Sequence, residues 1–553
     1  MQLPSLKVDD QSASLSWGSS EQEKGEIFTK PTIVEFMLKT SGIFNNLFNT
    51  ATRILEPSCG QGEFVISVTT KLVDLTQQGQ GELSYLDTLN LITAYDISPS
   101  SIEIAKHKTQ QILCKIYSKK QAQAIVSSWF HHGDFLLTEL ESSFSHIMGN
   151  PPYIRIENIP TTILAAYRSR FSTMKDRADI YIAFYQKCLE SLSDKGKLTF
   201  ICTDRWTKNL YGSSLRAFIS NGYQLDMYVD LYGKDAFQSN VLAYPAITQI
   251  SKQKQKLTLI VHQPIFNKNL AESVLRIFEN KEQPSENMQI RKDIIDNQKP
   301  WLFGNGDELA LIKRLEDTFP SLVDAGCQVF IGAATGNNKI YIVNDNVELE
   351  QCRKLPVITA ADIRTGELKP SGNFIINTYN DNGVINLEDF PLLQIYLRNH
   401  EDILRSRHVA KKTPLHWFKT IDKVHPTRAA KEKLLIPDIK SKLMAVYDAG
   451  EFHPNNSIYY IVTNDWDIRA LQAVLMSGVG QMFVAAYSTK VSGGNLRFQA
   501  QHLRRIRLPL WQDVSASMAE KLRLAAITND LQRAKQLTAQ LYNFNEQETQ
   551  LLG

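Results

Sequence analysis

Four consecutive residues, Asn150-Pro151-Pro152-Tyr153, have the chemistry needed to hold a planar amine. The two prolines fix φ and remove two backbone donors, which leaves carbonyl acceptors available. An aryl amine is a poor nucleophile because its lone pair is delocalised into the ring. The Asn150 side-chain oxygen and the Pro151 carbonyl could accept its two hydrogens and direct the lone pair at an electrophilic methyl group. Such catalysis depends on positioning and electrostatics and needs no strong general base.

Tyr153 adds a flat face on which a target base could stack. The alternative interpretation of the four residues is a rigid Pro-Pro turn beside a surface aromatic side chain. The motifs upstream decide between the two, because a methyl-transfer site also needs a methyl donor.

The segment from Glu56 to Gly62 is a candidate cofactor loop; it reads Glu56-Pro57-Ser58-Cys59-Gly60-Gln61-Gly62. It lacks the third glycine of the dinucleotide fingerprint and the Lys-Ser/Thr of a phosphate loop. It has an acid instead, and a carboxylate can accept hydrogen bonds from an amino group. The loop therefore suits a cofactor that carries an ammonium and a sulfonium and no phosphate. S-adenosylmethionine is such a ligand.

Two further acids follow in an order that fits this cofactor. Asp96 ends the next apolar run, 34 positions after Gly62, where a carboxylate could bind both ribose hydroxyls. Asp134, in Gly133-Asp134-Phe135, is placed to accept a hydrogen bond from the adenine amine. Taken alone, either acid would more often be a solvated loop residue or a helix cap.

The elements that must position these residues alternate between short apolar runs and amphipathic stretches from about residue 52 to 250, which predicts a wound α/β domain. In such a domain, ligands bind at the carboxyl ends of the strands. The predicted strands are Arg53–Leu55, Leu91–Asp96, Ser145–Gly149 and Lys197–Cys202, and the predicted helices are Phe64–Leu75, Ser101–Cys114 and Tyr181–Leu192. Glu56, Asp96 and Asn150 then lie at one edge of the sheet.

Composition sets the outer limits. A chain of 553 residues with 43% hydrophobic and 22% charged residues predicts a soluble globular protein of two or three domains. The net charge of +3 is too small for a global polyanion-binding field, so a nucleic-acid surface would be a local patch. The six cysteines form no zinc framework, and no metal is expected. Without a signal peptide or an expected membrane span, we predict a cytoplasmic protein of a bacterium or archaeon.

The motif set resembles the N6-adenine DNA methyltransferases of type II restriction–modification systems. The order is theirs too, with cofactor motifs first, the catalytic motif next and target recognition last, the gamma order of Taq-like enzymes. The resemblance implies a Rossmann-like S-adenosylmethionine-dependent methyltransferase domain and a mixed α+β C-terminal target-recognition domain. We place a polar lead at 1–24, the catalytic domain at 25–270 and the target-recognition domain, with a C-terminal helical segment, at 271–553.

The resemblance also assigns residues. Phe28-Thr29-Lys30-Pro31 corresponds to a segment that lies against the cofactor's methionine part, and Phe184 to a contact of its adenine. Phe237 takes the place of a second aromatic that sandwiches the flipped base, although the family's usual Phe-Pro is Phe237-Gln238 here. The predicted cofactor-binding residues are Thr29, Pro31, Glu56, Pro57, Ser58, Cys59, Gly60, Gly62, Asp96, Ile97, Asp134, Phe135, Asn150 and Phe184.

A basic stretch in the second half is a candidate DNA surface. Residues 396–445 contain twelve Lys and Arg against five acids, a net charge of +7, interleaved with His416, Trp417, Phe418 and His425. Such a pattern fits phosphate contacts with some base contacts, although an ordinary solvated basic face has the same composition. The predicted DNA-binding residues are Lys411, Lys412, Lys419, Arg428 and Arg497.

The predicted function is thus site-specific methylation of adenine N6 in duplex DNA, with the base rotated out of the stack. The expected partners are double-stranded DNA and a cognate restriction endonuclease, and the enzyme is expected to act as a monomer, away from membranes, without a fused nuclease. Three alternatives stay open. Cytosine-N4 methylation uses the same amine chemistry but more often Ser at position 150. Protein-glutamine methylation also uses Asn-Pro-Pro-Tyr, although its enzymes end soon after the catalytic domain. The third alternative is a binding-only specificity protein.

Overall fold

The computed structural model describes residues 27–553 apart from 141–142, 235, 238–244, 253–256, 293, 492–493 and 553. The predicted polar lead at 1–24 and Gln238 therefore lie outside the described residues. The chain forms two compact units, Met1–Phe303 and Gly304–Gly553. Each unit is described here by itself.

Among the described residues, the first unit is built on a nine-stranded sheet of order β3-β2-β1-β4-β5-β7-β6-β8-β9. The strands are β1 (Ile54–Glu56), β2 (Ile92–Asp96), β3 (Phe130–His132), β4 (Phe144–Gly149), β5 (Leu192–Thr203), β6 (Gln224–Asp230), β7 (Pro245–Ser251), β8 (Leu257–His262) and β9 (Met288–Lys292). Strands β1 to β5 pair in parallel, whereas β7 runs antiparallel to both β5 and β6. The predicted wound α/β fold is confirmed.

Helices cover both faces of this sheet. The helices of the unit are α3 (Pro31–Ser41), α4 (Glu63–Gln77), α5 (Tyr85–Leu89), α6 (Pro99–Leu113), α7 (Lys119–Trp129), α8 (Thr161–Arg170), α9 (Tyr181–Glu190), α10 (Ser213–Gly222) and α11 (Leu270–Phe278). One hydrophobic core joins α3, α4, α6, α7 and α11 to alternate strand residues such as Ile54 and Met148. A second core on the other face joins α8, α9 and α10 to residues such as Leu55 and Ile147. Strands buried on both faces explain the nearly continuous apolar runs in the sequence.

The order of β2, β1 and β4 places a crevice at the carboxyl edge of the sheet, where ligands bind in folds of this kind. A glycine is required where the chain turns from β1 into α4. Gly62 has φ +90°, and a Cβ on it would lie 2.9 Å from the Cβ of Ala105 in α6. Both the left-handed conformation and the close approach of α6 exclude a larger residue there.

The first unit extends beyond the expected boundary between residues 270 and 271. β7 ends at Ser251 and β8 begins at Leu257, so the polar Lys- and Gln-rich run between them connects two strands of the same sheet. α11 then packs on α3, and β9 pairs with β8 at the edge of the sheet. The apolar face of α11 and the hydrogen-bonding edge of β8 need these partners. Beyond β9, Phe303 stacks on Tyr228 of β6, and the unit ends there.

The second unit is a mixed α+β structure. In the part of the chain that the structure describes, it contains two four-stranded sheets, β10-β20-β16-β18 and β11-β13-β12-β19, with two smaller ones. The strands of the first of these sheets are β10 (Cys327–Ile331), β16 (Lys433–Pro437), β18 (Val446–Asp448) and β20 (Ile458–Thr463), and those of the second are β11 (Ile342–Val343), β12 (Lys354–Ile358), β13 (Phe374–Ile376) and β19 (His453–Pro454). The smaller sheets are β14 (Tyr379–Asn380) with β15 (Gly383–Val384), and β17 (Ile439–Lys440) with β22 (Asn495–Arg497) and β21 (Lys490–Val491).

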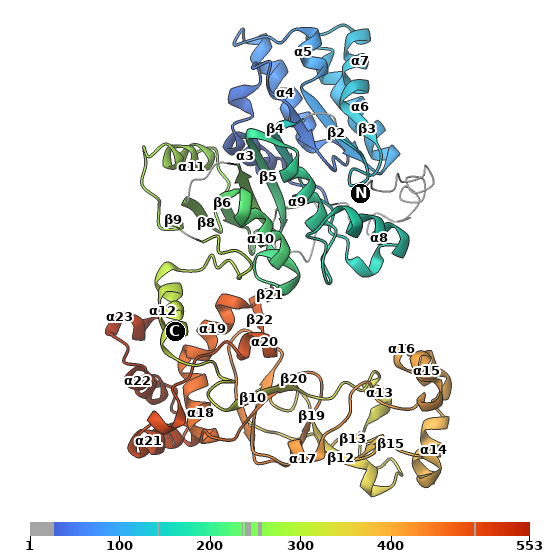
Figure 1. Cartoon of the computed structure of the whole chain (residues 1–553), viewed down its shortest axis with the longest axis vertical. Helices are drawn as coiled ribbons and strands as arrows, with labels where there is room; N and C mark the ends of the chain where they lie inside the picture. The colour runs from blue at the N-terminus through green and yellow to red at the C-terminus, as the bar shows by residue number, and fades with distance from the viewer. Residues whose placement is uncertain are drawn as a thin grey trace, which may run out of the picture. The chain divides into compact units, whose positions relative to one another are not determined.

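Short helices surround these sheets. They are α12 (Gly306–Thr318), α13 (Asn338–Tyr341), α14 (Pro391–Arg398), α15 (Glu401–Ser406), α16 (His408–Lys412), α17 (Pro426–Ala429), α18 (Ile468–Val474), α19 (Gly480–Tyr487) and α20 (Ala500–Leu503). The predicted C-terminal helical segment consists of α21 (Ala516–Ile527), α22 (Leu531–Leu541) and α23 (Glu546–Gln550), coloured red in Figure 1. α21 packs on α18, and α22 packs on both α18 and α21.

The stretch Ile468–Tyr487 is long and apolar enough to cross a membrane by length and mean hydropathy. It comprises α18, a π-helical turn (Leu475–Val479) and α19, and 67% of its most apolar window is buried inside the protein. Polar residues such as Gln472 and Gln481 interrupt it, and both bind backbone groups at 441–445. It is a core helix of the second unit.

Candidate active site

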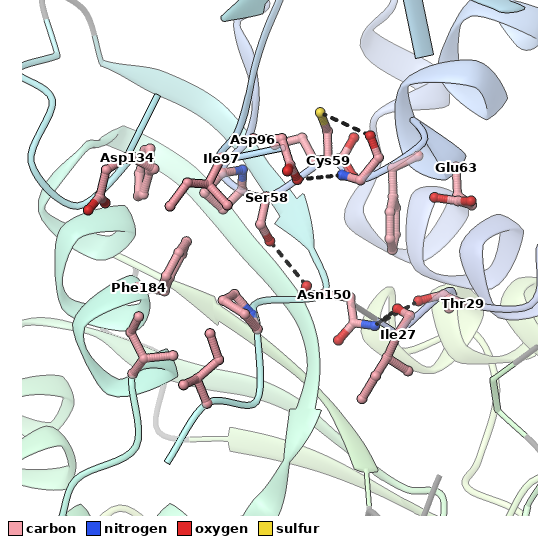
Figure 2. A pocket seen from close by; sticks show the side chains of 18 of the residues that line it. Ile27, Thr29, Ser58, Cys59, Glu63, Asp96, Ile97, Asp134, Asn150 and Phe184 are labelled. Atoms are coloured by element: carbon pink, nitrogen blue, oxygen red, sulfur yellow. Dashed lines mark hydrogen bonds between the residues drawn. The ribbon is translucent and has the colours of Figure 1, made fainter. Parts of the chain in front are cut away.

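A pocket opens at the carboxyl edge of the first unit's sheet, beside the ends of β1, β2 and β4. Figure 2 shows Glu63 and Thr29 toward one end, Asp134 and Phe184 toward the other, and Asp96, Ile97 and Ser58 between them. The residues that line the pocket are Ile27, Phe28, Thr29, Glu56, Pro57, Ser58, Cys59, Gly60, Glu63, Phe64, Asp96, Ile97, Gly133, Asp134, Phe135, Asn150, Pro152, Ile154, Tyr167, Ile180 and Phe184.

Three carboxyl groups make this pocket attractive to cations. Glu56 ends β1 and is 1% exposed, Glu63 begins α4, and Asp96 ends β2. Burial raises the pKa of Glu56 well above its ordinary value, and Glu63 and Asp96 add to the rise by repulsion. An acid buried beside two like charges is stabilised by a ligand that brings positive charge. The three carboxyl groups therefore fit an ammonium or sulfonium group.

Asp96 is held in place by the loop around it. The backbone N–H of Gly60 donates to Oδ2 at 2.7 Å, and the N–H of Ser98 donates to Oδ1 at 2.8 Å. These two bonds fix the plane of the carboxylate at the pocket wall. Gly60 has φ +50°, a left-handed backbone conformation that glycine adopts readily. The candidate cofactor loop therefore turns at the residue whose N–H binds Asp96.

The other end of the pocket is aromatic and apolar. The rings of Phe135 and Phe184 stack with centroids 5.5 Å apart at 24°. Ile154 and Ile180 complete this wall and belong to the same hydrophobic core. Asp134 is the acid at this end, and its Oδ1 accepts a hydrogen bond from the N–H of Leu136 at 2.9 Å. A flat apolar slot with one acid at its edge fits a heteroaromatic ring that carries an amine.

Asn150 follows β4 and reaches the pocket with its amide oriented by named partners. Nδ2 donates to the carbonyl of Ile27 at 2.7 Å and to Oγ1 of Thr29 at 3.3 Å. The Tyr153 hydroxyl donates to Oδ1 at 2.7 Å. The Ser58 hydroxyl donates to the Asn150 carbonyl at 3.1 Å, which joins the candidate cofactor loop to the Asn-Pro-Pro-Tyr motif. The side-chain oxygen is thereby turned away from Ile27 and kept as an acceptor.

Tyr153 and Phe237 lie next to this amide. Their ring centroids are 6.3 Å apart at 66°, an edge arrangement. The Tyr153 hydroxyl also reaches the carbonyl of Ile201 in β5 at 3.3 Å, and burial raises its pKa well above the ordinary value. Phe237 is positioned by a backbone bridge to Thr29, and Lys30 N–H donates to the Ala236 carbonyl at 3.1 Å. The first described residues thus contact both the Asn150 amide and the backbone beside Phe237.

Comparison with known proteins decides the family. Residues 63–237 match the Eco57I restriction-modification methylase family, and residues 355–510 match the TaqI-like C-terminal specificity domain. The type II methyltransferase M.XhoI of Xanthomonas vasicola is 41% identical over 96% of this chain and 99% of its own length. M.PaeR7I of Pseudomonas aeruginosa is 40% identical over 96% of this chain and 94% of its own. The chain is a type II DNA methyltransferase.

Solved structures support the fold of this methyltransferase. The type IIL restriction-modification enzyme MmeI, determined in complex with DNA, aligns with a TM-score of 0.60 over 95% of this chain and 77% of its own, at 12% identity. The type ISP enzyme LlaBIII, bound to DNA, aligns with a TM-score of 0.52 over 91% of this chain and 39% of its own, at 13% identity. The predicted resemblance to type II restriction–modification methyltransferases is therefore confirmed, as are the two fold classes.

The structure brings together most of the residues that the methyltransferase sequence singled out. Twelve of the fourteen predicted cofactor residues line the pocket, and among the described residues Pro31 and Gly62 do not. Pro31 begins α3, and Gly62 is the N-cap of α4. Of the predicted catalytic residues, Asn150 and Pro152 line the pocket, whereas Pro151, Tyr153 and the predicted stacking residue Phe237 lie outside its lining.

Sequence reasoning missed several lining residues of the methyltransferase pocket. Phe28 and Gly133 stand inside segments that the sequence singled out, and Glu63 and Ile154 directly follow such segments, so extending each motif by one position finds them. Ile180 and Tyr167 carry no such signal, because apolar residues on or beside a helix predict only a core. The remaining missed residues are Ile27 and Phe64.

The predicted DNA-binding residues of the methyltransferase lie in the second unit and differ in their surroundings. Lys411 and Lys412 are exposed in the last turn of α16, and Lys419 is half-buried. The Arg428 guanidinium lies 3.9 Å from the centre of the Phe330 ring. Arg497 forms an ion pair with Asp438 through Nη2, and its Nε donates to the same carboxylate at 3.2 Å. The two adjacent lysines therefore present the most accessible charge of the five.

Part of the basic stretch has a structural role. The Arg407 guanidinium donates to the carbonyls of Thr335, Trp417 and Lys419 at 2.8–3.0 Å, which ties three segments together. Lys433 and Asp448 form an ion pair at 2.6 Å with both side chains fully buried. The net charge of residues 396–445 thus overstates the charge available to a partner.

Proposed function

We propose that this methyltransferase transfers a methyl group from S-adenosylmethionine to N6 of an adenine rotated out of duplex DNA. The observation that carries the proposal is the orientation of Asn150. Its Nδ2 is committed to Ile27 and Thr29, so its Oδ1 is available as an acceptor for an exocyclic amine. A carbonyl oxygen has two lone pairs, and Oδ1 can accept from both the Tyr153 hydroxyl and the target.

The residues of the chain divide the work. Glu56, Glu63 and Asp96 favour the cationic methionine part and the ribose, and Phe135, Phe184 and Asp134 receive the adenine of the cofactor. S-adenosylmethionine, when bound, supplies a methyl group on a positively charged sulfur. Asn150 Oδ1 and the Pro151 carbonyl accept the two amine hydrogens and so aim the nitrogen lone pair. Tyr153 and Phe237, whose rings meet edge to face in this structure, would have to separate to hold the ring of the target base between them. Positioning of this kind accounts for large rate effects without a strong base.

The proposed DNA contacts are Lys411, Lys412, Lys419, Arg428 and Arg497 in the TaqI-like specificity domain. The charge of the exposed lysine pair suits phosphates, and each neutralised phosphate releases counterions on binding. Arg428 and Arg497 would have to exchange their present partners, Phe330 and Asp438, for DNA. In a restriction–modification system, methylation by this chain would protect sites from a cognate endonuclease.

Single-molecule sequencing of DNA treated with the purified protein and S-adenosylmethionine tests the proposal. We expect N6-methyladenine at one recognition sequence. Asn150→Ala should abolish methylation while cofactor and DNA binding persist, and Asn90→Ala, at an exposed residue just before β2, is the matched control. N4-methylcytosine in the product would establish the cytosine alternative, and full turnover by the Asn150 variant would refute the assigned role.

A further inference from the structure

The helix that follows the catalytic motif contributes a tyrosine to the far wall of the pocket. Tyr167 lies in α8, lines the pocket and is 1% exposed. Its hydroxyl donates to Oδ2 of Asp134 at 2.6 Å. Neither the sequence motifs nor the family assignment gives this residue a role.

Tyr167 and the backbone together determine how Asp134 is held. The Leu136 N–H donates to Oδ1 while the Tyr167 hydroxyl donates to Oδ2, so each carboxylate oxygen has a donor of known direction. Burial and the neighbouring Asp134 raise the pKa of Tyr167 well above its ordinary value. The phenol therefore keeps its proton and remains the donor of the pair throughout the pH range in which proteins are stable.

The loop that carries Asp134 is clamped at further points. Arg170, one turn after Tyr167, donates from Nη1 to the Leu137 carbonyl at 2.9 Å and pairs with Glu139 at 3.2 Å. Lys187 of α9 donates to the carbonyls of Phe135 and Thr138. The position of Asp134 is thus set by α8 and α9, which lie on one face of the sheet with the aromatic wall of the pocket.

We propose that Tyr167 is a positioning residue for cofactor recognition: its hydroxyl holds the Asp134 carboxylate where it accepts a hydrogen bond from the 6-amino group of the cofactor's adenine. The inference rests on the proposed use of S-adenosylmethionine. It adds that selection of adenine over other purines depends on a side chain that does not itself touch the amine. A hydrogen bond to a charged group loses strength steeply when its geometry is lost, and Tyr167 preserves that geometry.

The test compares the binding affinities of two ligands. Binding of S-adenosylhomocysteine, and of its analogue with hydrogen in place of the 6-amino group, is measured by titration calorimetry on the full chain. Tyr167→Phe removes the hydroxyl and keeps the ring in the wall. Tyr223→Phe is the control, because Tyr223 also donates its hydroxyl within the first unit, to the Leu189 carbonyl at 3.0 Å, but does not line the pocket.

We expect the wild-type chain to favour the 6-amino ligand. Tyr167→Phe should lower the affinity for that ligand by about tenfold, the order of one hydrogen bond to a charged group. It should change the affinity for the analogue with hydrogen at position 6 by less than about twofold. Comparing ligands within one variant cancels any general loosening of the fold. Tyr223→Phe should leave both affinities unchanged.

Two results would overturn the inference while leaving the cofactor assignment intact. One is an equal loss of affinity for both ligands in Tyr167→Phe, which would indicate that Tyr167 has a role in packing. The other is a wild-type chain that binds both ligands equally well. A wild-type chain that binds neither ligand would instead refute the proposed cofactor.

Discussion

At the scale of single residues, the acids at the carboxylate-rich end of the pocket link cofactor binding to pH. The raised pKa of Glu56 means that its carboxyl group keeps a proton to higher pH than an exposed glutamate does. A cationic ligand binds better to the ionised form, so binding expels the proton. The affinity for S-adenosylmethionine should therefore rise as the pH increases through the raised pKa.

Below that pKa, one expelled proton corresponds to a change in affinity of up to about tenfold per pH unit. Titrations with S-adenosylmethionine from pH 5 to pH 8 measure the slope of log affinity against pH. Glu56→Gln should flatten it, whereas Glu35→Gln, at an exposed residue paired with Lys39, should not. An unchanged slope in Glu56→Gln would show that Glu56 is not the linked group.

The residues that were identified by their own chemistry, Glu56, Asp96, Asp134 and Asn150, share one property: each lies at or just after the end of a strand and stands out by type. Asn150 after β4 and Asp96 at the end of β2 are polar groups where an apolar run stops. Tyr167 has no such marker, because Ile163 and Tyr167 are spaced as on any helix face that packs on a sheet. The pairing of Arg497 with Asp438 was equally hidden, since the two residues are far apart in the chain.

At the scale of elements, α16 is the best place to test DNA contact by the specificity domain. Lys411 and Lys412 are exposed, adjacent and in the last turn of the helix. If both contact phosphates, the double variant Lys411→Ala/Lys412→Ala should reduce the slope of log affinity against log salt by about 2 units. Fluorescence anisotropy with a labelled duplex measures the slope at several salt concentrations.

Lys339→Ala/Lys369→Ala removes the same charge at exposed positions outside the basic stretch and serves as the control. It should leave the slope within error of the wild-type value. A double α16 variant with an unchanged slope would show that the helix carries an ordinary solvated face.

The boundary between the two compact units follows Phe303, later in the chain than the expected boundary after residue 270. The core strands and helices around the site were predicted to within a few residues, because their apolar periods are strong. The polar run that begins at Ser251 was consistent with a turn or a linker, and local composition does not distinguish the two. Only the long-range pairing of β8 with β6 and of β9 with β8 places these two strands in the first sheet, and with them residues 257–292 in the first unit.

At the scale of the whole molecule, the two compact units divide the proposed activity. The pocket and Asn150 belong to the unit that ends at Phe303, and the specificity-domain match belongs to the unit that begins at Gly304. Each unit also has hydrophobic cores of its own. We therefore expect residues 1–303 to bind S-adenosylhomocysteine with near wild-type affinity and to lose sequence-specific DNA binding.

Calorimetry with the ligand and anisotropy with specific and unrelated duplexes check both expectations, and residues 304–553 tested in parallel should bind no ligand. Failure of residues 1–303 to bind the ligand, with a folded circular-dichroism spectrum, would mean that the pocket needs the second unit.

The contacts between the first described residues and the catalytic motif also bear on synthesis of the chain. Ile27 and Thr29 orient the Asn150 amide, and the same segment is anchored by the backbone at Ala236 and Phe237. During synthesis the segment that orients the amide emerges first, but its backbone anchor is complete only when residues 236 and 237 have followed. We therefore expect translation products that stop before residue 236 to lack this support of the Asn150 amide.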